Sequence, residues 1–195
     1  MVIDYRDARK EDCPQIAEYI NYASDGILDY LFKDNAAGMA VTETLTYGLK
    51  NEKGDDSYKS VIVAEYQQDI IGIVQSYSAI YHRIDDEMGS FFSKEKLGQF
   101  KEFYDSKVEN SLLINAMFVE PDFRCKGIGT KLLSLTKARA ESLSFDKLSL
   151  FVLADNLNAQ RVYHSFGFKK VKGIKLKVDV NINHEDEIYL MSSNV

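Results

Sequence analysis

Hydrophobic residues recur along this chain with two periods, one typical of strands and one typical of helices. Alternating polar and apolar residues predict a first strand at Val2–Asp7. Two runs rich in β-branched residues, Val61–Tyr66 and Ile70–Ile80, predict a hairpin joined by Gln67–Asp69. Gly72 interrupts the second run, which indicates either a bulge or the close approach of another backbone.

Three helices are predicted between the first strand and this hairpin. The first begins at Asp12, which is expected to cap it, with Pro14 in the first turn and Gln15 completing a capping box. The other two are expected at Ile27–Phe32 and Thr42–Leu49, and all three should pack on the sheet. The apolar stripe of the first helix consists of Ile16, Tyr19, Ile20 and Ala23.

The segment Tyr81–Ser111 begins with polar residues and continues with apolar residues at helical spacing. It predicts a loop followed by one amphipathic helix. Packing in the core explains this stripe better than a ligand-binding role does. The stripe consists of Leu97, Phe100, Tyr104 and Val108.

The second half of the chain alternates strands and helices. Leu112–Val119 predicts a buried strand that Pro121 and Asp122 end, and a helix is expected over about 128–143. Lys147–Leu153 predicts a second buried strand. The remaining elements are a helix with the apolar face Ala159, Val162, Tyr163 and Phe166, ended by Gly167, and two closing strands at Phe168–Val180 and Glu187–Ser192.

Composition narrows the class of protein. At 195 residues the chain is expected to form one domain, 1–195, with an insertion at about 81–111. A net charge of −6 argues against nucleic acid as a partner, because such binding needs clustered lysine and arginine; an acidic protein attracts cations instead. No apolar run reaches the roughly 18 residues of a membrane span, and the start does not resemble a signal peptide. With only Cys13 and Cys125 present, a reducing, cytoplasmic location is expected.

A metal site is not expected. His184–Glu187 carries ligand-type side chains, but it lies in a polar stretch that is better explained as a solvated turn.

The junction between the Leu112–Val119 strand and the following helix carries the chemistry. The first amides of a helix have no partner within the helix, and the helix dipole makes that end electropositive. Gly127 and Gly129 keep side chains away from these amides, while Arg124 and Lys126 add positive charge. This pattern predicts a cradle for a pyrophosphate. The spacing fits neither a nucleoside-triphosphate loop nor a dinucleotide fingerprint.

The pattern Arg124-x-x-Gly127-x-Gly129 after a strand resembles the acetyl-coenzyme A motif of the GNAT superfamily of N-acetyltransferases. A second motif of that family, N-x-x-A-x-x-x-Y-x-x-x-G-F, is matched by Asn156–Phe168. The two motifs and their flanks cover 112–170. The resemblance implies an α/β (α+β) fold, with a mixed, mostly antiparallel twisted sheet of about seven strands flanked by helices and with splayed central parallel strands.

The resemblance also implies how acetyl-CoA, the expected acyl donor, is bound. The backbone of the first parallel strand pairs with the pantetheine arm, the amides of the glycine turn hold the pyrophosphate, and the second motif contacts the arm from the opposite side. The residues concerned are Met117, Phe118, Val119, Arg124, Cys125, Lys126, Gly127, Ile128, Gly129, Thr130, Asn156, Asn158, Ala159 and Tyr163. Cys125 is either a thiol with a lowered pKa or, more simply, a tolerated small residue, with Gly127 and Gly129 as the positions that the backbone needs.

Catalysis requires a donor for the developing oxyanion and a proton for the leaving thiolate. By analogy with the family, the amide of Met117 supplies the first and the phenol of Tyr163 the second. The general base is not apparent: Asn115, expected to alternate with Leu113 and Met117, is an amide that cannot take a proton, and Glu120 is expected to be solvated. Asn115 is therefore expected to position water or the acceptor.

The leading hypothesis is an N-acetyltransferase that acts on a primary amine of a small molecule or protein by direct attack. The alternative is a non-catalytic acyl-CoA sensor, which the amide at Asn115 favours. The acceptor is expected between the region Ser24–Leu49 and the insertion. The sequence is compatible with a homodimer. Candidate acceptor contacts are Tyr22, Asp25, Asp29, Tyr30, Tyr81, Asp85, Asp86 and Glu87.

Overall fold

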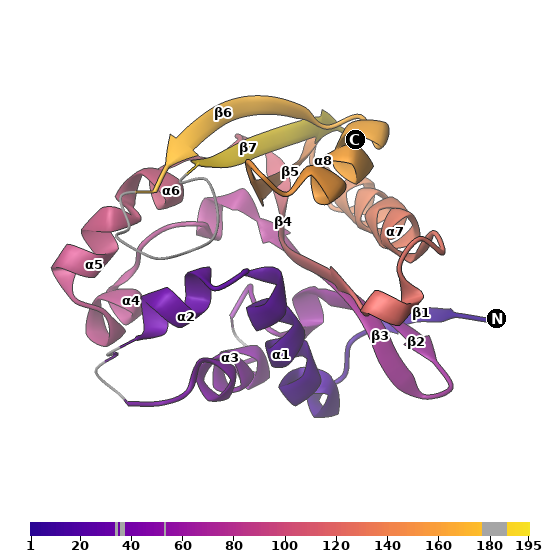
Figure 1. Cartoon of the computed structure of the whole chain (residues 1–195), viewed down its shortest axis with the longest axis horizontal. Helices are drawn as coiled ribbons and strands as arrows, with labels where there is room; N and C mark the ends of the chain where they lie inside the picture. Colours follow the sequence, from indigo (N-terminus) through magenta and orange to yellow (C-terminus); the bar gives the residue numbers. More distant parts are fainter. Residues whose placement is uncertain (34, 36–37, 53, 177–186) are drawn as a thin grey trace.

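A seven-stranded sheet runs through the molecule in the order β1-β2-β3-β4-β5-β7-β6 (Figure 1). The computed structural model describes residues 1–195 apart from 34, 36–37, 53 and 177–186. Neighbouring strands pair antiparallel except β4 and β5, which are parallel. The expected fold class is confirmed. The strands are β1 (Asp4–Asp7), β2 (Val61–Tyr66), β3 (Asp69–Ser78), β4 (Ser111–Val119), β5 (Lys147–Leu153), β6 (Lys169–Lys175) and β7 (Glu187–Asn194).

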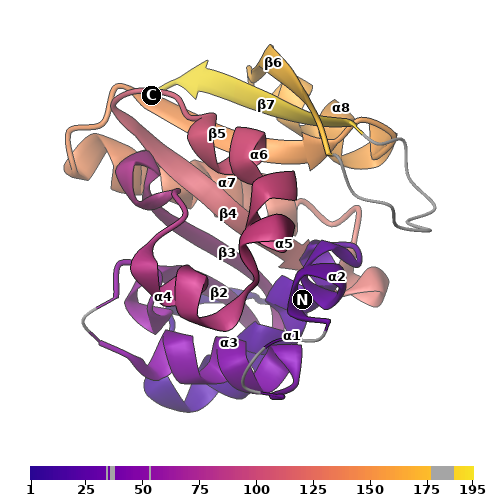
Figure 2. The ribbon, with the colours of Figure 1, turned by 90° about the vertical axis from the view of Figure 1, so that its left-hand side faces the viewer.

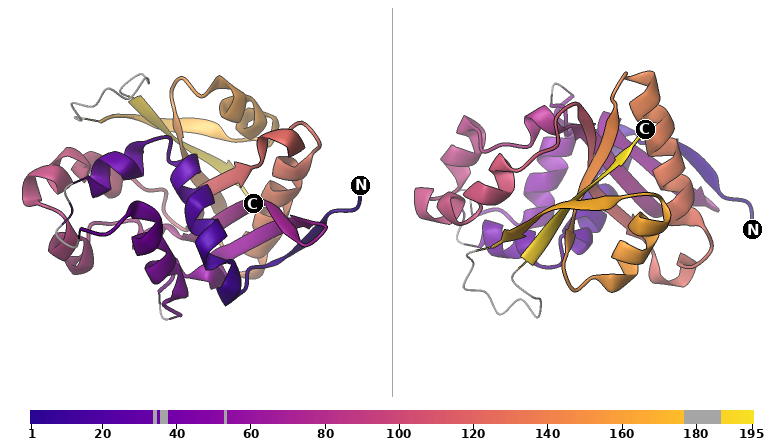
Figure 3. Two further views of the ribbon diagram at one scale, coloured as in Figure 1. Left: turned by 60° about the horizontal axis from the view of Figure 1, so that its bottom comes forward. Right: turned by 90° about the horizontal axis from the view of Figure 1, so that it is seen from above.

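Helices cover both faces of this sheet (Figures 1 and 3). On one face α1 and its neighbours bury a core against β2, β3 and β4. On the other face α7 and α8 bury a second core against β2 to β5. The helices are α1 (Cys13–Ala23), α2 (Ile27–Phe32), α3 (Val41–Lys50), α4 (Asp86–Phe91), α5 (Lys94–Gln99), α6 (Lys101–Asp105), α7 (Ile128–Ser142) and α8 (Leu157–Ser165).

The hairpin β2–β3 is confirmed, with a tighter turn than expected. Gln67 and Gln68 have φ angles of 52° and 73°, as in a two-residue turn, and Asp69 already pairs with Tyr66. Gly72 lies beside a bulge between the two strands, and a Cβ atom there would lie 3.0 Å from the Phe118 carbonyl oxygen. Both expectations for Gly72, a bulge and a close backbone approach, therefore hold.

The expected capping box at the start of α1 is wrong. The Asp12 carboxylate makes no capping bond to α1; it accepts from the Arg9 amide at 2.7 Å and pairs with Arg6 at 2.7 Å. A short 3-10 turn, Lys10–Asp12, precedes the helix and takes the place of the cap. Gln15 donates instead to the Tyr19 hydroxyl and to the Ile70 carbonyl.

The insertion folds differently from the single helix expected for it. A 3-10 turn (Ala79–Tyr81) leads to the three short helices α4, α5 and α6. Asp85 and Ser93 cap the first two of these helices, and the break between α5 and α6 is at Phe100. Packing in the core is confirmed for the stripe, because Leu97 and Phe100 are buried together with Leu31 of α2. Figure 2 shows the insertion helices on the same side of the molecule as α2. The closing strand expected at Phe168–Val180 is β6, which ends at Lys175, and residues 177–180 lie outside the described residues.

Candidate active site

The two parallel strands at the centre of the sheet pair over only part of their length. Cα partners run from Ser111 with Lys147 to Ile114 with Leu150 and stop there. Beyond this point β4 continues to pair with β3, and β5 with β7. The strands therefore diverge between Asn115–Val119 and Phe151–Leu153, a space that we call the splay. The splayed central strands predicted from the sequence are present.

A bulge marks the point where the splay begins. Gln75 is opposite Ala116 and Ser76 is opposite Ile114, so Asn115 is the additional residue on β4. The bulge reverses the alternation of side chains. Ile114 and Met117 both face the α7 side of the sheet. The expectation that Asn115 alternates in register with Met117 is therefore wrong.

Backbone groups of β4 are directed into the splay. The Glu120 amide donates to the Ile71 carbonyl at 2.9 Å, so Gly72 and Val119 form a pair without mutual hydrogen bonds. By the alternation of an antiparallel ladder, the N–H and C=O groups of Val119 and Met117 point away from β3. They face the side on which β5 has departed.

The turn before α7 presents a row of unpaired amides. The first backbone bond of the helix runs from the Lys131 amide to the Gly127 carbonyl. Within the described part of the chain, the six amides from Cys125 to Thr130 donate to no protein oxygen. Such a row at the positive end of a 15-residue helix is suited to an anion with several oxygen atoms.

Two residues of this turn have left-handed backbone conformations, and they differ from the two expected. Gly127 has φ 80°, as glycine permits, but Cys125 also has φ 58°. Gly129 is helical, and a Cβ atom there would meet only the Met117 methyl group at 3.9 Å. The expectation that the backbone conformation needs glycine at Gly129 is therefore wrong, and Cys125 is a small residue in a conformation that favours glycine.

The cationic side chains of the turn fold back onto β4 and its end. Arg124 donates to the Val119 carbonyl at 2.9 Å and lies 5.7 Å from the centre of the Phe118 ring. Lys126 donates to the Asp122 carbonyl at 2.6 Å and lies over Phe123. Both side chains are exposed, so their charge remains beside the free amides without an acidic partner among the described residues.

The second motif forms the start of α8. Asn156 caps this helix, because its side-chain oxygen accepts from the Ala159 amide at 3.1 Å. Its NH2 group and the second lone pair of its oxygen remain for a ligand. Asn158 is exposed and accepts weakly from Arg161 at 3.4 Å, while Ala159 packs on the α7-side core.

Tyr163 lies on the buried face of α8. Its ring is 8% exposed and packs edge-on to Phe168, with the two ring centres 5.8 Å apart. Burial raises the pKa of its phenol to about 12. The phenol therefore keeps its proton at any ordinary working pH.

Asn115 belongs to a hydrogen-bonded row of side chains at the mouth of the splay. Its NH2 group donates to the Gln75 side-chain oxygen at 2.8 Å, and its own oxygen accepts from the Tyr77 hydroxyl at 2.9 Å. Gln75 donates in turn to the Asp56 backbone carbonyl at 2.7 Å. Burial raises the pKa of Tyr77, so this phenol is also protonated at neutral pH. The sequence did not single out Gln75 or Tyr77, although both follow the alternation of β3.

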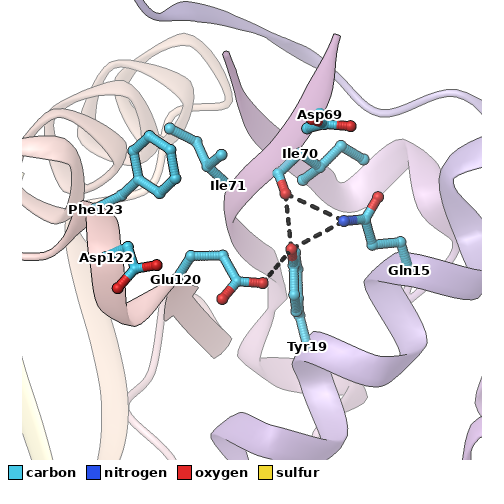
Figure 4. Close-up of a pocket in the computed structure, with 8 residues that line it drawn as sticks. All are labelled: Gln15, Tyr19, Asp69, Ile70, Ile71, Glu120, Asp122 and Phe123. Carbon is cyan, nitrogen blue, oxygen red and sulfur yellow. Dashed lines mark hydrogen bonds between the residues drawn. The ribbon is translucent and has the colours of Figure 1, made fainter. Parts of the chain in front are cut away.

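Glu120, expected to be solvated, is half-buried and bonded. Its carboxylate accepts from the Tyr19 hydroxyl at 2.7 Å. Burial, followed by this carboxylate, raises the pKa of Tyr19. Figure 4 shows the two groups on the wall of a pocket of about 270 Å³ beside the start of β3, with Gln15 and the Ile70 carbonyl on the same hydroxyl.

The candidate acceptor contacts have mixed surroundings. Tyr22 is 64% exposed and stacks on Phe118, with ring centres 5.8 Å apart. Tyr30 donates to Gln99 of α5 and so joins α2 to the insertion. Asp85 caps α4 by accepting from the Met88 amide. Asp29 accepts a hydrogen bond from Asn21, and Asp25 begins a turn with a φ angle of 52°. Tyr81 and Asp86 are exposed. The side chain of Glu87 lies outside the described residues.

No group of three or more His, Cys, Asp and Glu side chains in the described ranges could hold a metal ion. His184 and its two following neighbours are not among these residues. None of the described helices has the length and apolarity needed to span a membrane.

Comparison with known proteins identifies the family. The model of the acetyltransferase (GNAT) family matches residues 27–168. A crystal structure described as an acetyltransferase is 25% identical, with a TM-score of 0.69, covering 98% of this chain and 99% of the other. YncA from Salmonella typhimurium, solved with acetyl-CoA, is 18% identical over 100% of this chain and 94% of its own, with a TM-score of 0.63. The PaiA N-acetyltransferase from Thermoplasma acidophilum, solved with coenzyme A, is 16% identical over 100% of both chains, with a TM-score of 0.61. With its splayed central strands and with well over half of its length matched, this chain belongs to the GNAT family of acetyltransferases.

Proposed function

We propose that this chain transfers the acetyl group of acetyl-CoA to a primary amine of a small molecule or protein. The row of six unpaired amides at the positive end of α7, next to the splay, carries this proposal. Membership of the GNAT family and the coenzyme complexes of YncA and PaiA support acetyl-CoA as the donor.

The residues present fit acetyl-CoA. The amides from Cys125 to Thr130 would hold the pyrophosphate, with Arg124 and Lys126 adding charge. The backbone groups of Met117 and Val119 that face the splay would pair with the amides of the pantetheine arm. The free NH2 group of Asn156 would donate to the same arm, with Phe118, Asn158 and Ala159 alongside.

When bound, acetyl-CoA supplies the thioester whose carbonyl carbon the amine attacks. In this proposal the Met117 amide donates to the carbonyl oxygen as negative charge develops there. The Tyr163 hydroxyl would face the sulfur that leaves when the carbon–sulfur bond breaks, and the proton that the nitrogen loses as the amide forms would pass to that sulfur. A phenol with a pKa of about 12 gives up its proton reluctantly to a thiolate, whose conjugate acid has a pKa of about 8.5. Tyr163 therefore acts chiefly by donating a hydrogen bond that strengthens as the sulfur becomes negative.

Neither of the two residues that the sequence suggested for the place of the general base serves as one. Asn115 is an amide, and Glu120 is engaged by the Tyr19 hydroxyl. We therefore infer that the amine reaches the site after losing its ammonium proton to water. Activity should then rise with pH up to the pKa of the amine, because the fraction of neutral amine rises over that range.

The test is an acetyl-transfer assay with putrescine, spermidine, kanamycin and a tetrapeptide with a free α-amino group. Release of coenzyme A thiol and mass spectrometry of the acetylated amine are measured together. Acetyl-CoA binding without turnover on any amine favours the alternative, a non-catalytic acyl-CoA sensor, for which the amide at Asn115 is the supporting observation. Absence of acetyl-CoA binding contradicts both functions.

A further inference from the structure

The row of hydrogen-bonded side chains that includes Gln75 and Asn115 is anchored to the backbone carbonyl of Asp56. Gln75 is 3% exposed on β3, and its NH2 group lies 2.7 Å from the backbone carbonyl of Asp56. A backbone carbonyl oxygen can only accept hydrogen bonds. The end of the Gln75 amide that faces Asp56 must therefore be its nitrogen, which settles an orientation that the shape of an amide leaves open.

The orientation of the Gln75 amide determines the orientation of the Asn115 amide. With its nitrogen turned to Asp56, Gln75 presents its oxygen to Asn115 at 2.8 Å, and only the nitrogen of Asn115 can donate to it. The oxygen of Asn115 must then face outward. It receives the Tyr77 hydroxyl at 2.9 Å on one side and has a second lone pair to offer.

The outward oxygen lies where the acceptor amine would react. Asn115 is exposed and forms the bulge at which β4 and β5 begin to diverge. Two residues further on, the Met117 amide faces the splay. The same strand thus offers an oxygen that can accept an N–H and, close by, an N–H that can donate to a carbonyl oxygen.

We propose that Gln75 is a positioning residue for the acceptor: it holds the Asn115 oxygen outward so that this oxygen accepts an N–H of the incoming neutral amine and directs the nitrogen lone pair toward the splay. This inference rests on the proposed acetyl transfer. The recognised group is an amine with at least one N–H, and its reacting nitrogen is uncharged because only an uncharged amine has a lone pair with which to attack the thioester.

The main test replaces Gln75 by methionine, which has a similar shape but cannot make either hydrogen bond. Asn115 is then free to rotate. We expect the KM of the best amine of the panel to rise about tenfold, the size of one lost net hydrogen bond, while the dissociation constant of acetyl-CoA stays unchanged. The matched control is Ser76→Ala, a neighbouring buried position on β3 whose hydroxyl has no partner among the described residues. It should leave the amine KM unchanged.

A double-mutant cycle separates positioning from general damage. If Gln75 acts through Asn115, then Asn115→Ala alone raises the amine KM, and adding Gln75→Met to Asn115→Ala raises it no further. Additive effects of the two substitutions, or a Gln75→Met enzyme with the wild-type KM, would overturn the proposal. A wild-type protein that turns over no amine refutes the proposed function itself, which is a different result.

A further measurement does not depend on whether variants at Gln75 fold. In the wild-type protein the side-chain NH2 of Asn115, identified by its loss in Asn115→Ala, should exchange its hydrogens slowly for an exposed residue because it donates to a buried oxygen. Exchange at the rate of a free side chain would show that the oxygen is not held outward.

Discussion

The two sides of the splay are built in different ways. The turn before α7 takes its properties from one short segment, 124–130, and exposes backbone amides. The opposite side is assembled from segments far apart in the chain: the insertion helices, α2 and the loop that holds Asp56. A site made of backbone in one segment can be read from a motif. A surface made of packed side chains from several segments cannot, and that is where acceptor specificity must be encoded.

The largest effect is expected at Gly127. Valine there requires a left-handed conformation that β-branched residues avoid, so Gly127→Val should distort the amide row and abolish acetyl-CoA binding. The measurement is thermal unfolding with acetyl-CoA at a hundred times the wild-type dissociation constant, where the ligand adds about 2.7 kcal/mol to the free energy of unfolding.

Gly127→Asn is the matched control, because asparagine tolerates this conformation but still adds a side chain. Binding by the asparagine variant alone would show that backbone shape matters. Binding by both variants would contradict the cradle.

The next effect concerns the Tyr163 hydroxyl, which is proposed to donate a hydrogen bond to the leaving sulfur. Tyr163→Phe removes one hydroxyl from a buried ring, so acetyl-CoA affinity should hardly change while turnover falls by about 100-fold. Single-turnover kinetics with a working amine give the chemical step. Since the pKa of Tyr163 is about 12, wild-type turnover should show no decline from loss of this proton up to about pH 10. An unchanged chemical step in the phenylalanine variant would leave Tyr163 with a packing role only.

His82 makes the stability of the insertion sensitive to acid. Burial lowers the pKa of this imidazole to about 4, and its ring lies against Phe103, Tyr104 and Phe151. In the unfolded chain this histidine has a pKa near 6.5, so between pH 6.5 and pH 4 the unfolded chain binds a proton that the folded chain does not. The contribution of neutral His82 to stability is therefore complete above pH 6.5 and is lost as the pH falls toward 4.

Between pH 7 and pH 5 this one group should lower the free energy of unfolding by about 2 kcal/mol. Urea unfolding at the two pH values measures it. His82→Phe should remove that part of the slope, and an identical slope in both proteins would assign the acid sensitivity to other groups.

A smaller gain is expected at Cys125. Its left-handed backbone costs about 1–2 kcal/mol for a residue with a Cβ, so Cys125→Gly should stabilise the fold, by at most about 1 kcal/mol once the greater freedom of glycine in the unfolded chain is counted. Cys125→Ser is the control, since it keeps the Cβ atom. Equal stability of the glycine and serine variants would show that the conformation costs nothing here.

The smallest effect tests the acceptor side. Asp85→Asn preserves a side chain that can cap α4 and removes only the charge. The KM of spermidine should rise by about threefold at low salt and less at high salt, because the carboxylate acts at a distance through a screened field. A KM that is the same at both salt concentrations would remove Asp85 from acceptor recognition.

The sequence predicts most of the strands and helices, because long apolar runs and helical stripes are local signals. It fails where one residue has two competing partners. Asp12 has the type and spacing of a cap, but Arg6, brought near by β1, takes its carboxylate. The apolar stripe of the insertion satisfies the helical period, but the helix breaks at Phe100 between α5 and α6 and ends at Ser106, before Val108.

The site shows the same division. The amide row follows from its glycines and its place after a strand, so it could be predicted. The direction of Asn115 could not, since it depends on a bulge that adds one residue to β4 relative to β3. Glu120 looks like a surface residue in the sequence, and only the fold brings Tyr19 to it across 101 positions of the chain.

The bulge at Asn115 also sets how the chain tolerates changes in its length. A residue added to or lost from an exposed loop shifts only that loop. Deleting Asn115 would instead place Ala116 directly after Ile114, so that β4 pairs with β3 as a regular ladder and Met117, Phe118 and Val119 keep their present sides of the sheet. The bulge is therefore a point at which β4 tolerates the loss of one residue, and the cost falls on the hydrogen bonds of Asn115 with Gln75 and Tyr77 rather than on the core.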